Sequence, residues 1–318
     1  METAREKYQI IDETISRDNN LLSISQLCSI AEVSRSGYYS WKSNEKRRIK
    51  KEEKDRQDFE LILAAYKHRG YDKGARSIYM QLLHMNIIMN LKKIRRLMKK
   101  YHLVCKIRKA NPYRRMAKAM KTSNIAENLV NRQFKQEPRL IILTDITYLF
   151  YGKKKEKAYL SVMKDAFTNE VLAYTLSQSL EVDFVLMMVH QLFDKHGDTI
   201  KVNETIAHSD QGVHYTSIAF QKLLNDKGLR QSMSRRGNCW DNAPQESFFG
   251  HMKDEIGEWV SQCKTFEELQ KIVDDYMDYY NNDRYQWNLA KLSPSEYYQY
   301  YITGIYPLQT EKDDTIQK

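Results

Sequence analysis

Three carboxylates occupy positions where strands and a helix could hold them at the edge of a folded core. Asp145 interrupts the apolar segment RLIILTDITYLF, which is typical of a strand, and Asp210 ends the shorter strand-like segment ETIAHSD. Glu246 follows Pro244 at the start of a predicted helix. A carboxylate without a counter-charge is unfavourable in a core, so we expect Asp145 to lie at a solvent opening or beside a cation.

These acids are distant in sequence, yet the order of the elements can bring them together. Sixty-four residues separate Asp145 from Asp210, and thirty-five separate Asp210 from Glu246. If the two strands are neighbours and the helix packs across the sheet, three hard oxygen ligands meet at one place. Such a site suits two Mg²⁺ ions, which Mn²⁺ can replace. Two ions about 4 Å apart can activate a nucleophile and stabilise the leaving oxygen in phosphodiester cleavage.

Each acid also has a structural interpretation when it is taken alone. Asp145 can cap a turn, Asp210 can form an Asx-turn before Gly212, and Glu246 can favour the positive end of its helix. Lys253 lies seven residues after Glu246, about two turns, and therefore on the same helix face. Its ammonium could hold a phosphate there, or simply extend along the surface.

A polar and aromatic loop precedes Glu246. Its residues could hold an unpaired or distorted DNA end, or could serve only to begin the helix: Asn238, Trp240, Asp241 and Asn242. His208 and His214 flank Asp210 and could line a metal or DNA pocket, although packing or capping is the simpler role for both. The four cysteines show no paired spacing that would favour zinc or a disulfide framework.

The elements that must position these residues form a helical front and an α/β back. Strand-like segments occupy 139–150, 158–168 and 170–179, and helix and strand then alternate through a helix at 181–197, the strand ending at Asp210 and a helix at 214–228. We expect four regions: a helical region at 1–60, a basic helical DNA-binding region at 61–125, a catalytic domain at 126–300 and a tail at 301–318. Within 21–43, two short helices and a tight turn fit a helix-turn-helix or an ordinary helical hairpin.

The net charge of +10 is unevenly distributed, because residues 1–140 hold 32 Lys and Arg against 15 Asp and Glu. Between Lys92 and Lys121 there are thirteen basic residues and no acid. Asn90 can cap a helix whose apolar stripe faces a core and whose basic face could bind phosphates or merely be solvated. The candidate DNA contacts in this stretch are Lys92, Lys93, Arg96, Lys99, Lys100 and Arg108.

The composition favours packed domains, with 42% hydrophobic residues and only 11 Gly and 5 Pro. The apolar runs are shorter than the roughly 20 residues that a membrane helix requires. The N-terminus METAREKYQI is polar and does not read as a signal peptide. The sequence therefore predicts no membrane association and a reducing cytoplasm.

Four strings resemble the DDE transposases of bacterial insertion sequences. They are LTDITYL around Asp145, HSDQGVHYTS around Asp210, SMSRRGNCWDNAPQESFFGHMKDE around Glu246, and YYNNDRYQWNLAKLSPSEYY from Tyr279. More narrowly, they resemble the downstream-frame product of the IS-three-type elements, which belong with retroviral integrases in the ribonuclease-H-like superfamily. The resemblance covers roughly residues 20 to 300.

This resemblance implies a ribonuclease-H-like mixed-sheet catalytic domain behind helix-turn-helix-type DNA-binding regions. It implies that Asp145, Asp210 and Glu246 are the metal-binding catalytic triad and that Lys253 is the basic residue after the glutamate. The expected reaction is recognition of terminal inverted repeats, cleavage that frees a 3′ hydroxyl, and joining of that hydroxyl to target DNA. The expected setting is a homo-multimer on DNA in the bacterial nucleoid. Because family members are often made as frameshift fusions, an upstream-frame partner is also expected.

Two other functions remain open on the sequence. A structure-selective nuclease of the same fold would cut nucleic acid without joining strands. A DNA-binding regulator would occupy the element ends without cutting them. Strand-transfer products separate the first alternative from a transposase, and binding without metal-dependent cleavage would support the second.

Overall fold

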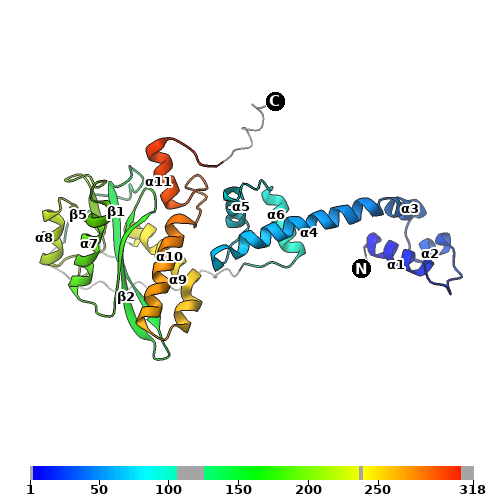
Figure 1. Ribbon diagram of the computed structural model, residues 1–318, viewed down its shortest axis with the longest axis horizontal. Coiled ribbons are helices and arrows are strands. Elements are labelled where there is room, and N and C mark those ends of the chain that lie inside the picture. Colours follow the sequence, from blue (N-terminus) through cyan, green and yellow to red (C-terminus); the bar gives the residue numbers. More distant parts are fainter. Residues whose placement is uncertain (1–2, 106–124, 236–238, 309–318) are drawn as a thin grey trace.

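The computed structural model describes residues 3–105, 125–235 and 239–308 of the chain (Figure 1). It begins with three short helices, α1 (Ala4–Ile15), α2 (Ile24–Ile30) and α3 (Arg35–Ser43). Side-chain oxygens of Thr3, Ser23 and Ser34 cap their N-termini. The helices enclose a small core around Ile11 and Tyr38. The two short helices predicted within 21–43 are therefore confirmed as α2 and α3.

A long helix, α4 (Glu45–Lys67), joins this unit to the rest of the chain and crosses the expected boundary at residue 60. In Figure 1 the α1–α3 unit lies at one end of α4, and α5 (Ala75–His84) and α6 (Leu91–Lys100) pack near the other end. The sequence accounts for the start and the orientation of α6. The side chain of Asn90 caps the helix by accepting a hydrogen bond from the N–H of Lys92, and the apolar stripe of the helix is buried. Ile62, Ile78 and Leu97 are fully buried in the core between these helices.

The back half is built on a five-stranded mixed sheet in the order β3-β2-β1-β4-β5. Its strands are β1 (Ile141–Tyr151), β2 (Glu156–Asp165), β3 (Val171–Ser177), β4 (Ile206–Ser209) and β5 (Arg230–Met233). The first three form an antiparallel meander, whereas β4 pairs in parallel with both β1 and β5. The three-strand meander predicted from 139–179 is thus confirmed.

Helices cover both faces of this sheet (Figure 1). On one face, α7 (Val182–His196) and α8 (Ile218–Asp226) pack against residues such as Ile142. On the other, α9 (Ala243–Gln262) and α10 (Phe266–Asn282) pack against residues such as Leu149, and α11 (Pro294–Thr303) follows. A 3₁₀ turn, η2 (Cys239–Asn242), leads into α9. This is the expected α/β, ribonuclease-H-like mixed-sheet architecture preceded by helical regions.

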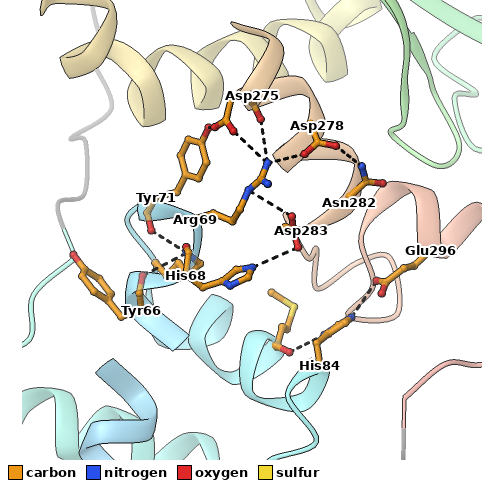
Figure 2. Close-up of polar contacts among 12 residues, drawn as sticks. Tyr66, His68, Arg69, Tyr71, His84, Asp275, Asp278, Asn282, Asp283 and Glu296 are labelled. Carbon is orange, nitrogen blue, oxygen red and sulfur yellow. Dashed lines mark hydrogen bonds and ion pairs between the residues drawn. The ribbon is translucent and has the colours of Figure 1, made fainter. Parts of the chain in front are cut away.

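The α4–α6 unit is anchored on α10 through the turn that follows α4. Tyr71 is 1% exposed, its ring stacks on that of Tyr279 with centroids 3.8 Å apart, and its hydroxyl donates to Asp275 at 2.8 Å. Figure 2 shows Arg69 lying between Asp275, Asp278 and Asp283, with 2.7 Å from its Nη2 to the Asp278 carboxylate. These contacts fix the α4–α6 unit against the half of the chain that carries the sheet.

Within the described ranges, no helix is both long and apolar enough to cross a membrane.

Candidate active site

Parallel pairing of β1 and β4 brings Asp145 and Asp210 together. The register aligns Leu143 with His208. Asp145 lies two residues after Leu143 within β1, and Asp210 lies two residues after His208, just past the end of β4. Continuing this register places the two acids side by side on neighbouring strands, which are about 4.8 Å apart, with their side chains on the same face. The predicted convergence of these two residues follows directly from the topology.

The face on which Asp145 lies is the one covered by α9. Alternation along β1 puts Asp145 on the side of Leu149 and Tyr151, both of which belong to the core formed with α9 and α10. Thr144 points the other way, where its hydroxyl donates to the Tyr215 hydroxyl at 3.3 Å. Asp145 therefore faces the helix that carries Glu246.

Glu246 lies in the first turn of α9, which the apolar residues Phe248, Phe249 and Met252 bind to the sheet. The pKa of Asp145 depends on the Glu246 carboxylate, the Asp210 carboxylate and the Lys253 ammonium. Burial raises the pKa of Asp145 most, the negative charges of Asp210 and Glu246 raise it further, and Lys253 opposes them. The four side chains thus share one electrostatic environment.

Each aspartate is held by a backbone hydrogen bond. Oδ1 of Asp145 accepts from the N–H of Ile146 at 2.8 Å, and Oδ1 of Asp210 accepts from the N–H of Gly212 at 2.9 Å. The second bond is the Asx-turn that the structural interpretation allowed. Because a carboxylate has two oxygens, this turn is compatible with a ligand role for Asp210. Asp210 is exposed as a residue, yet protein atoms crowd its carboxylate and raise its pKa.

The acid group fits divalent cations by its chemistry, because it presents only hard oxygen donors and because its mutual repulsion would be relieved by positive charge. Glu246 affects Asp145 less than Asp210 does. Among the described residues, no three His, Cys, Asp or Glu side chains are gathered closely enough to hold one ion.

The loop ahead of Glu246 is organised by Asp241, whose side chain is fully buried. Its carboxylate accepts from Nε and Nη2 of Arg235 at 2.9 and 3.0 Å, from Nε of Arg132 at 2.8 Å and from Nδ2 of Asn128 at 3.1 Å. These bonds hold the carboxylate charged and lower the pKa of Asp241 well below its usual range. Asp241 therefore orders the loop, which is the structural alternative to a DNA contact.

The other residues predicted in this loop have different surroundings. Trp240 is 68% exposed, and its indole is accessible to a partner. Asn242 is buried, and neither its amide oxygen nor its nitrogen has a hydrogen-bond partner in the part of the chain that the structure describes. Gln245, which the sequence analysis did not select, is also buried with both amide atoms unpartnered. Asn238 lies outside the described residues.

Both histidines near Asp210 are engaged in packing. His208 is fully buried, and its ring nitrogens lie 2.9 Å from the Ser232 hydroxyl and 2.9 Å from the Asp241 carbonyl oxygen. Burial lowers the pKa of His208, which favours the neutral ring. Nε2 of His214 lies 2.9 Å from the carbonyl oxygen of Leu180. The simpler role predicted for both residues agrees with these contacts.

The basic face of α6 is partly neutralised by acids of α4. Arg96 forms two hydrogen bonds of 2.7 Å with Asp55, and Lys100 lies 2.6 Å from Glu52 and 2.9 Å from Asp55. Lys93 forms an ion pair with Asp58. These three candidate DNA contacts brace α6 against α4. Lys92 and Lys99 are exposed, and Arg108 lies outside the described residues.

Family models match two parts of the chain. Residues 135–239 and 246–300 match two families described as "Integrase core domain", and residues 52–111 match an "HTH-like domain". Among solved structures, the chain is similar to the magnesium complex of the HTLV-2 integrase catalytic core domain, with 17% identity and a TM-score of 0.40, over 50% of this chain and 94% of that one.

Several bacterial proteins are similar over most of their length. A transposase-like protein of Haemophilus influenzae is 37% identical over 218 residues, which are 68% of this chain and 95% of that protein. InsK of insertion sequence element IS150 in Escherichia coli K12 is 32% identical over 86% of this chain and 93% of its own. InsF of IS3A, from the same organism, is 29% identical with the same coverage. Together with the integrase core and the HTH-like domain, these similarities show that the chain belongs to the IS3-type family of DDE transposases from bacterial insertion sequences.

Proposed function

We propose that this transposase binds the terminal inverted repeats of its insertion sequence, cuts DNA strands there and joins the freed 3′ hydroxyl to another DNA strand. The observation that carries this proposal is the acid group, because the β1/β4 register sets Asp145 beside Asp210 on the sheet face that α9 covers with Glu246. Family membership supports the DNA-cutting and joining chemistry.

Asp145, Asp210 and Glu246 are the residues that would hold two Mg²⁺ ions, or Mn²⁺ in their place. When bound, such ions supply positive charge that activates an attacking oxygen and stabilises the leaving oxygen of a phosphodiester. The chain's part is to hold carboxylates in place despite their repulsion. For Asp145 and Asp210, a backbone hydrogen bond fixes one oxygen of each carboxylate.

Other residues of the chain would position the DNA. Lys253 lies on the Glu246 face of α9 and would attract a phosphate next to the acids. The exposed indole of Trp240, close in sequence to Glu246, offers a surface on which a base can stack. On α6, Lys92 and Lys99 are exposed and would contact the backbone of the inverted repeat. Two DNA ends must be paired, so we propose that a homo-multimer assembles on them, with an upstream-frame product as a further partner.

A cleavage and joining assay tests this function. The full chain is incubated with a plasmid that carries the DNA ends flanking its gene, in Mg²⁺ or in EDTA, beside the variants Glu246→Gln and Glu258→Gln. Both substitutions remove one carboxylate from α9, but only the first removes a proposed ligand. We expect end cleavage and joined products in Mg²⁺, lost in EDTA and in Glu246→Gln and retained in Glu258→Gln.

The remaining outcomes point to the alternatives. Cleavage without joined products would favour a nuclease of the same fold. Binding to the ends without any metal-dependent cleavage would favour a regulator. Full activity in Glu246→Gln would mean that the acids are structural, and would overturn the site assignment.

A further inference from the structure

A large cavity lies between the helical unit and the catalytic half. Its volume is about 1090 Å³, and its wall is formed by α5, α9, α10 and the segments 132–136 and 284–288. It does not include the three acids, but Ser247 and His251 of its wall stand on α9 just after Glu246. The cavity therefore adjoins the proposed active site on the side of the DNA-binding helices.

Lys164 on β2 is a buried lysine in the wall of this cavity. It is 2% exposed, and the register pairs it with Leu143, so it lies on the same sheet face as Asp145. Its ammonium donates one hydrogen bond, to the carbonyl oxygen of Pro244 at 3.1 Å, and lies 5.7 Å from the ring centre of Phe248. No carboxylate of the described residues forms an ion pair with it, and burial lowers the pKa of Lys164 to about 7.

Lys73, a second buried lysine in this wall, has the contacts that are expected of a structural lysine. Lys73 is 3% exposed, and its ammonium donates to the carbonyl oxygens of Tyr66, His68 and Tyr71, which accounts for its three protons. Lys164 has the same burial but only one such acceptor in the described structure. A buried charge with unused donors is unfavourable, and an anion in the cavity would offset that cost.

The rim of the cavity combines an aromatic surface with cations. Trp287 is 46% exposed, and the guanidinium of Arg76 lies 5.5 Å from its ring centre. Two of the three acids in the wall are in ion pairs, Glu255 with Arg284 at 2.7 Å and Asp283 with Arg69, and the third, Asp72, accepts a hydrogen bond from the Tyr66 hydroxyl at 2.6 Å. Aromatic surfaces beside unneutralised cations are typical of sites for single-stranded nucleic acid, because every base can stack and every phosphate is anionic.

We propose that this cavity binds a single-stranded segment of the DNA substrate, with a phosphodiester at Lys164 and a base on Trp287. The inference rests on the proposed function, since the bound strand would be one that leaves the active site. Its volume is that of a pocket for a small ligand, which admits one or two nucleotides and excludes a duplex. The site would thus distinguish a frayed or tailed DNA end from a blunt one.

Fluorescence anisotropy in EDTA tests this site without any cleavage. The full chain is titrated with a labelled element end that is either blunt or carries a single-stranded tail. The variants are Lys164→Met, which keeps the apolar length of the side chain, and the rim variants Arg76→Gln and Trp287→Ala. The control is Lys153→Met, which removes an exposed charge from the β1–β2 turn.

We expect wild type and Lys153→Met to bind the tailed end more tightly than the blunt one. Lys164→Met should bind the tailed end about tenfold more weakly, as the loss of a charge-assisted contact predicts, and the blunt end within about twofold of wild type. For the tailed end, the slope of the logarithm of the binding constant against the logarithm of the salt concentration should also become shallower by about 0.7 in this variant. Arg76→Gln and Trp287→Ala, both at the rim, carry the test if Lys164→Met does not fold.

Two results would overturn the inference. Unchanged preference for the tailed end in Lys164→Met and in the rim variants would make Lys164 a structural lysine. Displacement of the tail by millimolar inorganic phosphate alone, with no effect of Trp287→Ala, would make the cavity an anion site and not a strand site. Because binding is measured in EDTA, a chain that prefers tailed ends but neither cuts nor joins would retain this inference while losing the proposed function.

Discussion

Replacing Asp241 by Asn should destabilise the catalytic half without removing any proposed ligand. The Asp241 carboxylate is fully buried and accepts two hydrogen bonds from the Arg235 side chain and one from Arg132. Breaking a fully buried pair costs about 3–5 kcal/mol. The two arginine side chains are 56% and 45% exposed, so water can solvate them once the charge is gone. We therefore expect a loss of about 2 kcal/mol in the free energy of unfolding.

For a domain of this size, that loss corresponds to a fall of about 4–8 °C in Tm, which differential scanning calorimetry resolves. The pKa of Asp241 is lowered in the folded state, chiefly by its hydrogen bonds with Arg235, so its contribution is present above the unfolded pKa of about 3.9 and is lost as the pH falls toward the folded value. The difference between wild type and Asp241→Asn should therefore be full at pH 7 and shrink below about pH 4.

The control is Asp226→Asn, which removes an exposed carboxylate at the end of α8 and should leave Tm unchanged. The reasoning fails if Asp241→Asn and Asp226→Asn have the same Tm at pH 7. If affinity for the element ends then changed only in Asp241→Asn, Asp241 would be a DNA contact and not the residue that orders the loop.

Three further substitutions test other parts of the structure. Asp145→Asn removes the repulsion between Asp145 and Asp210, which is about 1–3 kcal/mol for two charges on neighbouring strands, so the variant should have a higher Tm than wild type in EDTA. Mg²⁺ should stabilise wild type but not the variant. Thermal scans in which Mg²⁺ still stabilises the variant would contradict the metal assignment. Tyr71→Phe removes the 2.8 Å hydrogen bond to Asp275 but keeps the stacking on Tyr279, so hydrogen exchange in α5 should show a loss of about 1 kcal/mol; unchanged protection would mean that stacking alone anchors the unit. Asp55→Asn leaves Arg96 and Lys100 without their shared partner, so exchange should accelerate in α4 and α6 but not in the sheet, and equal acceleration in both would refute a local role.

Much of the fold could be predicted because it depends on local patterns. Runs of apolar, β-branched and aromatic residues mark the meander at 139–179, and Asn90 with an apolar stripe at helical spacing marks α6. The candidate acids could also be found, since Asp145 is a charge inside an apolar segment and Asp210 ends one. Such signals are readable because the residues that create them lie within a few positions of one another.

The sequence by itself therefore determined the kinds of elements, their order and the acids that stand at their ends. Only the tertiary structure decided what each charge meets. Arg96 of the basic stretch is neutralised by Asp55, which lies 41 residues away, Asp241 is bound by Arg132 from 109 residues away, and Lys164 is left with a single carbonyl in the wall of a cavity. Composition shows how many charges a segment carries, but pairing and burial depend on which distant elements pack together, and that packing sets whether a charge is structural or available to DNA.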